Sequence, residues 1–324
     1  MAKFKVYYTV QLDNSATEIF QANDFEIRTA SAQSEDVYCA ELAEFQPDAI
    51  MCRTEPVTAK MMGICKNLKV VGKQGAGIDN IDMHYCEANK LQVVFAPGGN
   101  ANAVAEHVLL LMLACAKRFS YVDRQFRGGN FLVRMDMTNT YELEGKTLGM
   151  IGCGRISSLA MKKAKYGFGM KVIGYDPYMT QEKMGDLCEL KATAKEVWEQ
   201  ADFVSIHLPV VDSTIHSVGR EQFSWMKPTA TFINCARGAL IREDEMVACL
   251  QDGTLFQAGL DVFEHEPIQE SSRVLFELDN VVMTPHMAAT TEQSVLNCCT
   301  SVANDIVAVC NGEAPKVPAN KPKF

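Results

Sequence analysis

The order of apolar and polar residues predicts strands and helices that alternate along the whole chain. Short apolar runs are typical of parallel strands buried on both faces, and apolar residues three or four positions apart are typical of helices. Over the first hundred residues we expect strands at 4–10, 25–29, 49–51, 70–72 and 93–96, and helices at 34–45, 58–65 and 80–89. This alternation predicts an α/β domain of its own.

The segment 102–118 is the longest helical pattern and is apolar on nearly all sides, so we expect a helix buried between domains or at a subunit contact. After it we expect strands at 147–151, 170–175, 203–207, 231–234, 256–260 and 281–283, and helices at 156–166, 241–250 and 291–310. The tail from residue 311 is rich in proline and lysine, which predicts a loose segment.

Turn residues divide this pattern into two domains. Pro97-Gly98-Gly99 marks a boundary near residue 100, and we expect a second crossing just after His286. The expected organisation is a discontinuous domain of residues 1–99 and 287–324 and a second domain of residues 100–286. Each is predicted to be a doubly wound parallel sheet of the α/β class.

The stretch 146–177 has the pattern of a mononucleotide-binding unit: a strand, a glycine turn, a helix and a second strand. Gly152 allows the tight turn, and Gly154 has no Cβ that would keep the backbone from a pyrophosphate. The N–H groups at Arg155 and Ile156, where the helix starts, then face the negative charge of that pyrophosphate. A purely structural turn between strand and helix is the alternative.

Asp176 ends this unit about 20 residues beyond the turn, where the dinucleotide pattern places an acid. Its carboxylate can accept hydrogen bonds from ribose hydroxyls and would repel a 2′-phosphate, which favours NAD over NADP. A purely structural turn would leave Asp176 without a role. Ser157 replaces the third glycine of the pattern; because serine is small, we expect a slightly displaced helix and an intact site.

Charge and cysteine content exclude several classes of protein. A formal charge of −9 and an isoelectric point near 5.3, without a lysine or arginine block, argue against nucleic acid or an anionic membrane surface as a partner. The twelve cysteines lie scattered in apolar segments without a CxxC or HExxH motif, so we expect no metal site. The apolar run 108–116 is too short to span a membrane, and the first residues predict a strand rather than a signal peptide. We therefore expect a cytoplasmic protein.

Five polar residues follow predicted strands of the second domain, at the sheet edge where a doubly wound fold binds its ligands. They are His207, Arg237, Asp261, Glu266 and His286, in the segments SIHLP, INCARGAL, GLDVFEHEP and TPHMAAT. These residue types suit the reduction of a 2-keto acid, which takes a hydride at carbon and a proton at oxygen. A histidine can supply the proton near neutral pH, and the planar donors of an arginine can hold a carboxylate.

Together with GCGRIS, YDP and GAGIDNID, these motifs closely resemble those of the NAD-dependent D-2-hydroxyacid dehydrogenase family. The resemblance covers nearly the whole chain and is nearest to the phosphoglycerate dehydrogenase branch. It implies a Rossmann dinucleotide-binding domain, a flavodoxin-like substrate domain and an active site in the cleft between them. It also implies NAD as cofactor and a homodimer.

By this resemblance, His286 is the proton donor and acceptor, Glu266 is the carboxylate that orients it, and Arg237 binds the substrate carboxylate and the developing alkoxide. A neighbouring carboxylate also favours the charged form of an imidazole. Plainer alternatives are a loop charge for Arg237 and a backbone-bonded histidine for His286. His84 and His107 are interpreted as structural or surface residues.

The resemblance also implies residues that bind the cofactor and the substrate. Asp261 corresponds to a family residue near the nicotinamide carboxamide, and its alternative role is to cap a loop at a strand end. The other residues implied for the cofactor are His207, Leu208, Pro209, Cys235, Ala236 and Ala288. The glycine loop 74–78 becomes a nest of backbone amides for the substrate carboxylate, formed by Gly75, Ala76 and Gly77.

Arg53 and Lys73 are candidates for binding a second anionic group such as a phosphate, and solvated basic residues are the alternative. Lys73 stands where the phosphoglycerate branch tends to place arginine. The leading hypothesis is interconversion of a 2-keto acid and a D-2-hydroxy acid with NAD(H). D-3-phosphoglycerate dehydrogenase of serine biosynthesis is the alternative among enzymes, and an NADH-sensing, corepressor-like binding protein is the alternative from another class.

Overall fold

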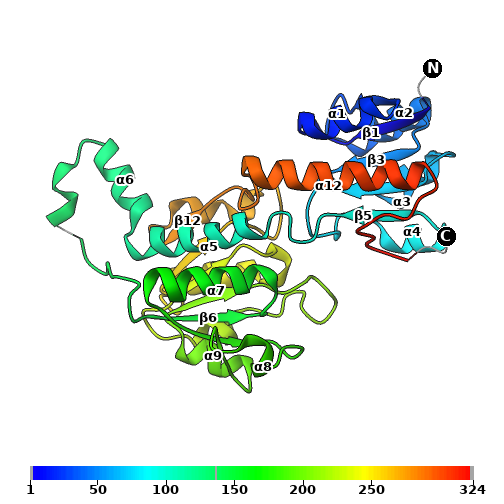
Figure 1. The fold of residues 1–324 in the computed structure, drawn as a ribbon. Coiled ribbons are helices and arrows are strands. Elements are labelled where there is room, and N and C mark those ends of the chain that lie inside the picture. Colours follow the sequence, from blue (N-terminus) through cyan, green and yellow to red (C-terminus); the bar gives the residue numbers. More distant parts are fainter. Residues whose placement is uncertain (1–2, 136, 322–324) are drawn as a thin grey trace. The chain divides into compact units, whose positions relative to one another are not determined.

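The computed structural model describes residues 3–135 and 137–321. The described residues divide into two compact units: unit 1 holds those up to Asn100 and from Thr290 onward, and unit 2 holds Ala101–Ala289. Each unit is a parallel β-sheet with helices on both faces (Figure 1). The predicted class of two doubly wound α/β sheets is confirmed.

Unit 1 contains the strands β1 (Phe4–Tyr8), β2 (Phe25–Thr29), β3 (Ala49–Cys52), β4 (Val70–Lys73) and β5 (Gln92–Phe95), and the helices α1 (Asn14–Ala22), α2 (Glu35–Phe45), α3 (Ala59–Ile64), α4 (Met83–Ala88) and α12 (Glu292–Cys310). The strands run parallel in the order β2-β1-β3-β4-β5. This is the flavodoxin-like order, in which a ligand is expected at the switch point between the first and third strands. Alternate residues of β1 face the two helix layers: Val6 packs with α1 and α12, and Tyr7 packs with α2 and α3.

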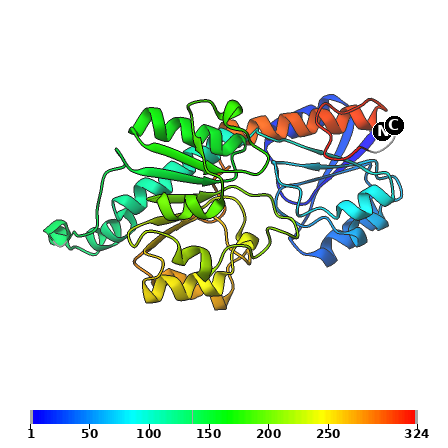
Figure 2. The same cartoon turned by 90° about the horizontal axis from the view of Figure 1, so that it is seen from below.

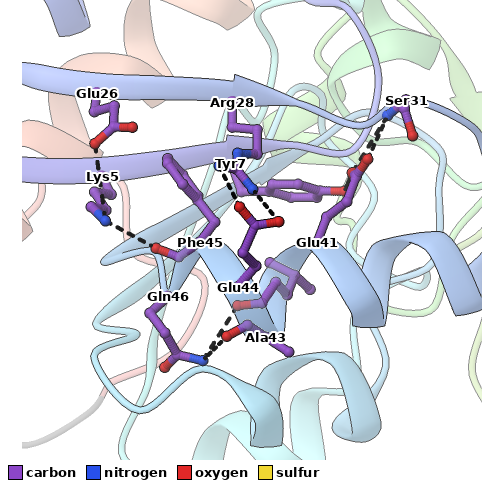
Figure 3. A network of polar contacts seen from close by, with 11 residues as sticks. Lys5, Tyr7, Glu26, Arg28, Ser31, Glu41, Ala43, Glu44, Phe45 and Gln46 are labelled. Carbon is purple, nitrogen blue, oxygen red and sulfur yellow. Dashed lines mark hydrogen bonds and ion pairs between the residues drawn. The ribbon is translucent and has the colours of Figure 1, made fainter.

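Polar contacts fasten α2 to β1 and β2 (Figure 3). Tyr7 donates a hydrogen bond of 2.5 Å to Glu41, whose carboxylate also accepts the backbone N–H of Ser31. Arg28 on β2 pairs with Glu44 at 3.3 Å. Burial and the Glu41 carboxylate raise the pKa of Tyr7, so its phenol stays protonated and keeps donating to the helix.

Residues 311–321, the described part of the predicted loose tail, are held by hydrogen bonds, so the prediction is wrong for them, and residues 322–324 lie outside the described part of the chain. Asp305 accepts hydrogen bonds of 2.9 Å from the backbone N–H groups of Lys316 and Val317. Asn320 donates to the carbonyl of Leu91 and accepts from the N–H of Val93, each at 2.8 Å. Each of these bonds pairs a polar side chain, Asp305 on α12 or Asn320 in the tail, with a backbone group, and a pattern of apolar side chains does not report them.

Unit 2 contains the strands β6 (Thr147–Ile151), β7 (Lys171–Tyr175), β8 (Glu189–Leu190), β9 (Phe203–Ile206), β10 (Thr231–Asn234), β11 (Gln257–Leu260) and β12 (Val281–Met283), the helices α5 (Ala101–Ala116), α6 (Phe119–Arg127), α7 (Arg155–Phe168), α8 (Gln181–Met184), α9 (Ala194–Gln200), α10 (Arg220–Ser224) and α11 (Glu243–Asp252), and the 3₁₀ helices η1 (Phe131–Met135), η2 (Gly238–Leu240) and η3 (Glu270–Glu277). The strands are parallel in the order β12-β11-β10-β9-β6-β7-β8. This is the Rossmann order with one strand added, and its switch point lies between β6 and β9.

Helix α5 lies beside α7 on one face of this sheet and packs on β10, β11 and β12 (Figure 1 and, turned, Figure 2). Val108, Leu111 and Met112 are fully buried there, whereas Leu110 is 52% exposed. The helix is buried as predicted, but the contacts that bury it lie within unit 2, whereas the sequence placed them between domains or at a subunit contact.

Several short elements are missing from the sequence prediction, namely α1, α6, α8, α9, α10 and β8. Helix α6 buries no residue, although its apolar side chains Phe119 and Phe126 are exposed on its surface, and the sequence prediction overlooked it. The start of α4 also differs from the prediction. The helix begins at Met83 instead of residue 80, and Asp82 caps it by accepting the N–H of Tyr85 at 2.9 Å; Asn80, before the helix, donates from its amide to the carbonyl of Glu55 at 2.6 Å.

Candidate functional site

The turn after β6 has the geometry that the dinucleotide pattern requires. Gly152 has a φ of +90°, and a Cβ there would lie 2.5 Å from the carbonyl oxygen of His207 on the neighbouring chain segment. Gly154 is the N-cap of α7, and a Cβ placed on it would meet no atom within 4 Å. The helix then starts with Arg155 and Ile156. The backbone of this turn is therefore open on the side where a pyrophosphate would approach.

Ser157 is fully buried in the first turn of α7. Its hydroxyl donates a hydrogen bond of 2.6 Å to the carbonyl of Gly152. The serine thus bonds the first turn of α7 to the turn that follows β6. The motif has a glycine at this position, which could not make this bond.

Asp176 lies just beyond the end of β7 and is half-buried. Its Oδ2 accepts the N–H of Cys153 at 2.9 Å, and its Oδ1 accepts the N–H of Tyr178 at 2.8 Å. The carboxylate is therefore fixed directly against the glycine turn. Each carboxylate oxygen can still accept another hydrogen bond, as binding of two ribose hydroxyls would require.

His207 follows β9 at the switch point of the unit 2 sheet, and its N–H donates to the carbonyl of Ile151 at 2.8 Å. The ring nitrogen Nε2 lies 2.9 Å from the hydroxyl of Ser205. Desolvation lowers the pKa of His207 to about 4, so the ring is neutral at physiological pH. The next residues of this loop are Leu208, which is half-buried, and Pro209, which is exposed.

Asn234 shapes the turn that carries Arg237. Its side-chain oxygen accepts the N–H of Ala236 at 2.9 Å, and its amide donates to the carbonyl of Arg237 at 3.0 Å. The next residue, Gly238, packs so closely that a Cβ on it would overlap the backbone of Phe263. Arg237 therefore lies next to the 263–266 loop, which leads to Glu266.

His286 and Glu266 form a direct pair. The ring nitrogen Nδ1 of His286 lies 2.5 Å from Oε2 of Glu266, and Oε1 of the same carboxylate accepts the N–H of Phe263 at 3.1 Å. The side chains of His286 and Glu266 are 31% and 33% exposed. The carboxylate is held by the backbone while the imidazole keeps an open side, an arrangement suited to proton transfer.

Asp261 is the centre of the loop that carries His286. It is fully buried at the end of β11, and its Oδ1 accepts the Thr284 hydroxyl at 2.6 Å and the N–H of Met287 at 2.9 Å. Its Oδ2 accepts the N–H of Ala288 at 2.9 Å, and its backbone carbonyl accepts the N–H of His286 at 2.7 Å. The loop-capping role that the sequence left open for Asp261 is thus present in the structure.

Cys235 contributes no reactive thiol to this site. The residue lies in the buried core of unit 2 at the end of β10. Burial and the Asp261 carboxylate raise the pKa of the Cys235 thiol well above its ordinary value, so the thiol stays neutral. A contact of this residue with a ligand would therefore involve its backbone or a neutral thiol.

In unit 1, the predicted substrate residues follow β3 and β4. The two loops are joined because the N–H of Gln74 donates to the carbonyl of Cys52 at 2.8 Å. Gly75 has a φ of +140°, and its carbonyl accepts the N–H of Ala96 at 2.8 Å. Lys73 is only 6% exposed, so it is not the solvated residue of the plainer interpretation. The remaining candidates are half-buried Ala76 and Gly77 and exposed Arg53.

The sequence interpretation missed Glu55, which lies at the switch point of the unit 1 sheet. Its Oε2 accepts the buried hydroxyl of Thr9, which follows β1, at 2.9 Å, and the N–H of Arg53, which follows β3, at 3.0 Å. A negative charge is therefore held on the loop of Arg53. The only sequence signal was the position of this acid two residues after a candidate phosphate ligand.

Asn100 was missed as well. Within residues 3–135 and 137–321, its Oδ1 and the Oε1 of Gln74 are buried without a hydrogen-bond partner. Such atoms are rare because an unmatched buried acceptor costs free energy. Both lie in segments already singled out, the glycine loop and the domain boundary, so they are candidates for contact with a ligand.

The described part of the chain shows neither a candidate metal cluster nor a candidate membrane-spanning helix. No three His, Cys, Asp or Glu side chains in it come together in a way that could hold a metal ion. None of its helices has both the length and the apolar character needed to cross a bilayer.

Comparison with known proteins places this geometry in context. The family model described as "D-isomer specific 2-hydroxyacid dehydrogenase, NAD binding domain" matches residues 109–288. A D-3-phosphoglycerate dehydrogenase of Methanocaldococcus jannaschii is 39% identical over 269 residues, which cover 83% of this chain and 50% of that protein. The chain covers 60% and 56% of two other D-3-phosphoglycerate dehydrogenases, so it spans little more than half the length of these relatives.

Other similar proteins match over most of their length. A hydroxypyruvate reductase of Thermotoga maritima is 36% identical over 298 residues, which cover 91% of this chain and 94% of that protein. Among solved structures, the D-lactate dehydrogenase of Aquifex aeolicus, in complex with NAD and lactic acid, has a TM-score of 0.85 at 25% identity. That match covers 98% of this chain and 100% of the other.

Proposed function

Because the chain belongs to the D-isomer specific 2-hydroxyacid dehydrogenase family, we propose that it interconverts a 2-keto acid and a D-2-hydroxy acid by hydride transfer with NAD(H). The observation that carries this proposal is the His286–Glu266 pair at 2.5 Å, beside the turn that carries Arg237. Imidazole, carboxylate and guanidinium are the three groups that this reaction needs.

The residues of unit 2 fit an NAD cofactor. The open backbone at Gly154 leaves room for the pyrophosphate, and the N–H groups of Arg155 and Ile156 would bind it at the start of α7. Asp176 would bind the adenosine ribose and disfavour a 2′-phosphate. When bound, NADH supplies the hydride. His207, Leu208, Pro209, Cys235, Ala236, Asp261 and Ala288 are the other residues proposed to border the cofactor.

His286 moves the proton. Glu266 engages Nδ1 and thereby fixes the orientation of the ring, which leaves Nε2 to exchange a proton with the substrate oxygen. Arg237 would hold the substrate carboxylate with its planar donors and stabilise the negative charge that develops on the oxygen. The backbone amides of Gly75, Ala76 and Gly77 are proposed to bind the carboxylate from unit 1.

The far end of the substrate separates the two enzymatic candidates. Lys73 and Arg53 could bind a phosphate, which favours D-3-phosphoglycerate dehydrogenase as the activity. Several relatives carry that name. Glu55 opposes it, because its carboxylate is fixed at the switch point on the loop of Arg53, where it would repel a phosphate. We favour a 2-keto acid without a phosphate and keep phosphoglycerate as the second candidate.

We also propose that unit 1 binds the substrate and that unit 2 binds NAD.

We further propose that the chain forms a homodimer. Some apolar side chains on and near α6 and η1 are 57% to 74% exposed, namely Phe119, Phe126, Phe131, Leu132 and Met135. Exposed apolar residues that gather in this way are typical of protein interfaces. Light scattering on the purified chain should give twice the monomer mass, and a monomer would refute this assignment.

Steady-state NADH oxidation by the purified chain tests the proposed activity. The substrates are glyoxylate, pyruvate, hydroxypyruvate, 2-ketoisocaproate and 3-phosphohydroxypyruvate. We expect turnover, with kcat/KM higher for an unphosphorylated keto acid than for the phosphorylated one. Tight NADH binding without turnover of any substrate would instead favour the NADH-sensing, corepressor-like protein, since such a protein could keep the same three side chains.

A further inference from the structure

We propose that His107 on α5 is a positioning residue for His286, and that it acts through the hydroxyl of Thr284 and the carboxylate of Asp261. This inference rests on the proposed function, since it concerns the same proton-transfer group. His107 comes 177 residues before Thr284 in the chain, yet its Nε2 lies 2.8 Å from the Thr284 hydroxyl. The same Nε2 is 3.5 Å from Oδ1 of Asp261.

The direction of each hydrogen bond follows from what the three groups can donate. An ionised carboxylate only accepts, so the Thr284 hydroxyl gives its single proton to Asp261 across 2.6 Å. The Thr284 oxygen then accepts, and His107 must donate from Nε2. Burial also lowers the pKa of His107, although the Asp261 carboxylate acts against this shift. His107 is therefore a neutral ring with its proton on Nε2.

Asp261 connects the His107–Thr284 hydrogen bond to the loop of His286. Its carbonyl accepts the N–H of His286, and its carboxylate accepts the N–H groups of Met287 and Ala288. His286 has a φ of +49°, a left-handed backbone that a residue with a Cβ adopts only when its surroundings impose it. If the carboxylate turns, the loop loses the bonds that hold this backbone, and the ring moves away from Glu266.

The surroundings of His107 are not those of an ordinary core position. The residue is 7% exposed on a helix face that is otherwise apolar, with Val104, Val108 and Leu111 as its buried neighbours. An apolar side chain there would leave the Thr284 oxygen without a donor. The polar group on this part of the helix face is thus directed at Thr284 and Asp261, in the loops that hold His286.

The experiment compares variants that remove the link with variants that keep it. His107→Leu and Thr284→Val remove the donor and the hydroxyl, whereas His107→Gln and Thr284→Ser retain them. His84→Leu, at an exposed histidine of unit 1, is the matched control. For each variant, kcat and KM are measured with the best keto acid of the panel, NADH affinity by fluorescence titration, and folding by near-ultraviolet circular dichroism.

We expect His107→Leu and Thr284→Val to lower kcat about tenfold to hundredfold, the size that a misplaced reacting group causes. NADH affinity should change less than threefold, and His107→Gln, Thr284→Ser and His84→Leu should stay near wild type. Because both residues act through one link, the double variant should be no slower than the slower single variant. The two retaining variants keep the test decisive if a removing variant fails to fold.

Three results would overturn the proposal: a kcat within threefold of wild type in both removing variants, equal losses in retaining and removing variants, or losses that multiply in the double variant. Each of these leaves the proposed activity intact. If the wild-type chain itself turns over no keto acid, the proposed function fails and the inference fails with it.

Discussion

The hydroxyl of Ser157 donates a hydrogen bond of 2.6 Å to the carbonyl oxygen of Gly152. In the dinucleotide-binding pattern this position is a glycine, which allows the helix to pack closely on the strand. The serine is fully buried, so the contact joins the first turn of α7 to the glycine turn from within the core. Where the motif has the close packing that a glycine allows, this protein has a hydrogen bond from a serine.

Ser157→Ala should therefore destabilise unit 2 by about 1–3 kcal/mol, because the alanine leaves a buried carbonyl with one hydrogen bond fewer. Ser158→Ala is the matched control, since Ser158 makes the same kind of bond, 2.9 Å to the carbonyl of Gly154, at a more exposed position. The control should change stability by less than about 0.5 kcal/mol. Urea unfolding followed by circular dichroism measures both, and equal effects of the two substitutions would contradict the special role of Ser157.

Asp176→Asn tests how the cofactor is selected. The amide oxygen can still accept the N–H of Cys153, so the turn keeps its cap while the negative charge is lost. The ratio of the NADPH dissociation constant to the NADH dissociation constant should fall about tenfold, because the repulsion of a 2′-phosphate is removed. Asp176→Ala should weaken NADH binding as well. Dissociation constants from fluorescence titration check this, and an unchanged NADH/NADPH ratio in Asp176→Asn would exclude the ribose role.

The sequence predicted the strands of this protein well. The strands β2, β6, β10 and β12 have the predicted bounds: β6, β10 and β12 are short, largely buried runs, and β2 alternates apolar and polar residues at the edge of its sheet. The helix α6 is short and buries no residue, so it was overlooked, and the order of the tail was missed because the polar side chains of Asp305 and Asn320 hold it by hydrogen bonds to backbone groups. Local patterns report burial of side chains and do not report such contacts.

The site shows the same limit. The strand-end motifs led directly to Glu266 and His286, which the structure joins at 2.5 Å. The link from His107 to Thr284 joins residues 177 positions apart, and no short motif contains both. The sequence left His107 as a structural or surface residue; the fold shows that it is buried and that it lies against Thr284.

Acid should destabilise the protein through His207. Its pKa is about 4 in the folded chain and 6.5 in its ordinary state, so the unfolded chain binds more protons between these values. The contribution of this residue to stability is therefore complete above about pH 6.5 and is lost progressively as the pH falls toward 4. The thermal midpoint of His207→Gln should fall less than that of wild type between pH 7 and pH 4.5. The exposed His84→Gln serves as control, and parallel curves for wild type and His207→Gln would refute the prediction.

Lys73→Ala distinguishes the two substrate candidates. If Lys73 binds a phosphate, kcat/KM for 3-phosphohydroxypyruvate should fall about tenfold to hundredfold more than for hydroxypyruvate, the effect of one charged hydrogen bond. Lys69→Ala, which removes a lysine paired with Asp48 at 3.2 Å just before β4, should affect both substrates equally. Equal losses of kcat/KM for the two substrates in Lys73→Ala would exclude the phosphate-binding role.

Glu55→Gln should act in the opposite direction. It should raise kcat/KM for 3-phosphohydroxypyruvate relative to kcat/KM for hydroxypyruvate, because a negative charge near the phosphate is removed.

The central claim is that His286, Glu266 and Arg237 serve a hydride transfer that yields a D-2-hydroxy acid. The most direct measurement uses NADH carrying deuterium at both C4 positions, with the best keto acid of the panel other than glyoxylate, whose product has no stereocentre, and analysis by chiral chromatography and mass spectrometry. We predict a product of D configuration with one deuterium at C2, and no product in the same time from His286→Phe. An L product, or a product without deuterium at C2, would contradict the account.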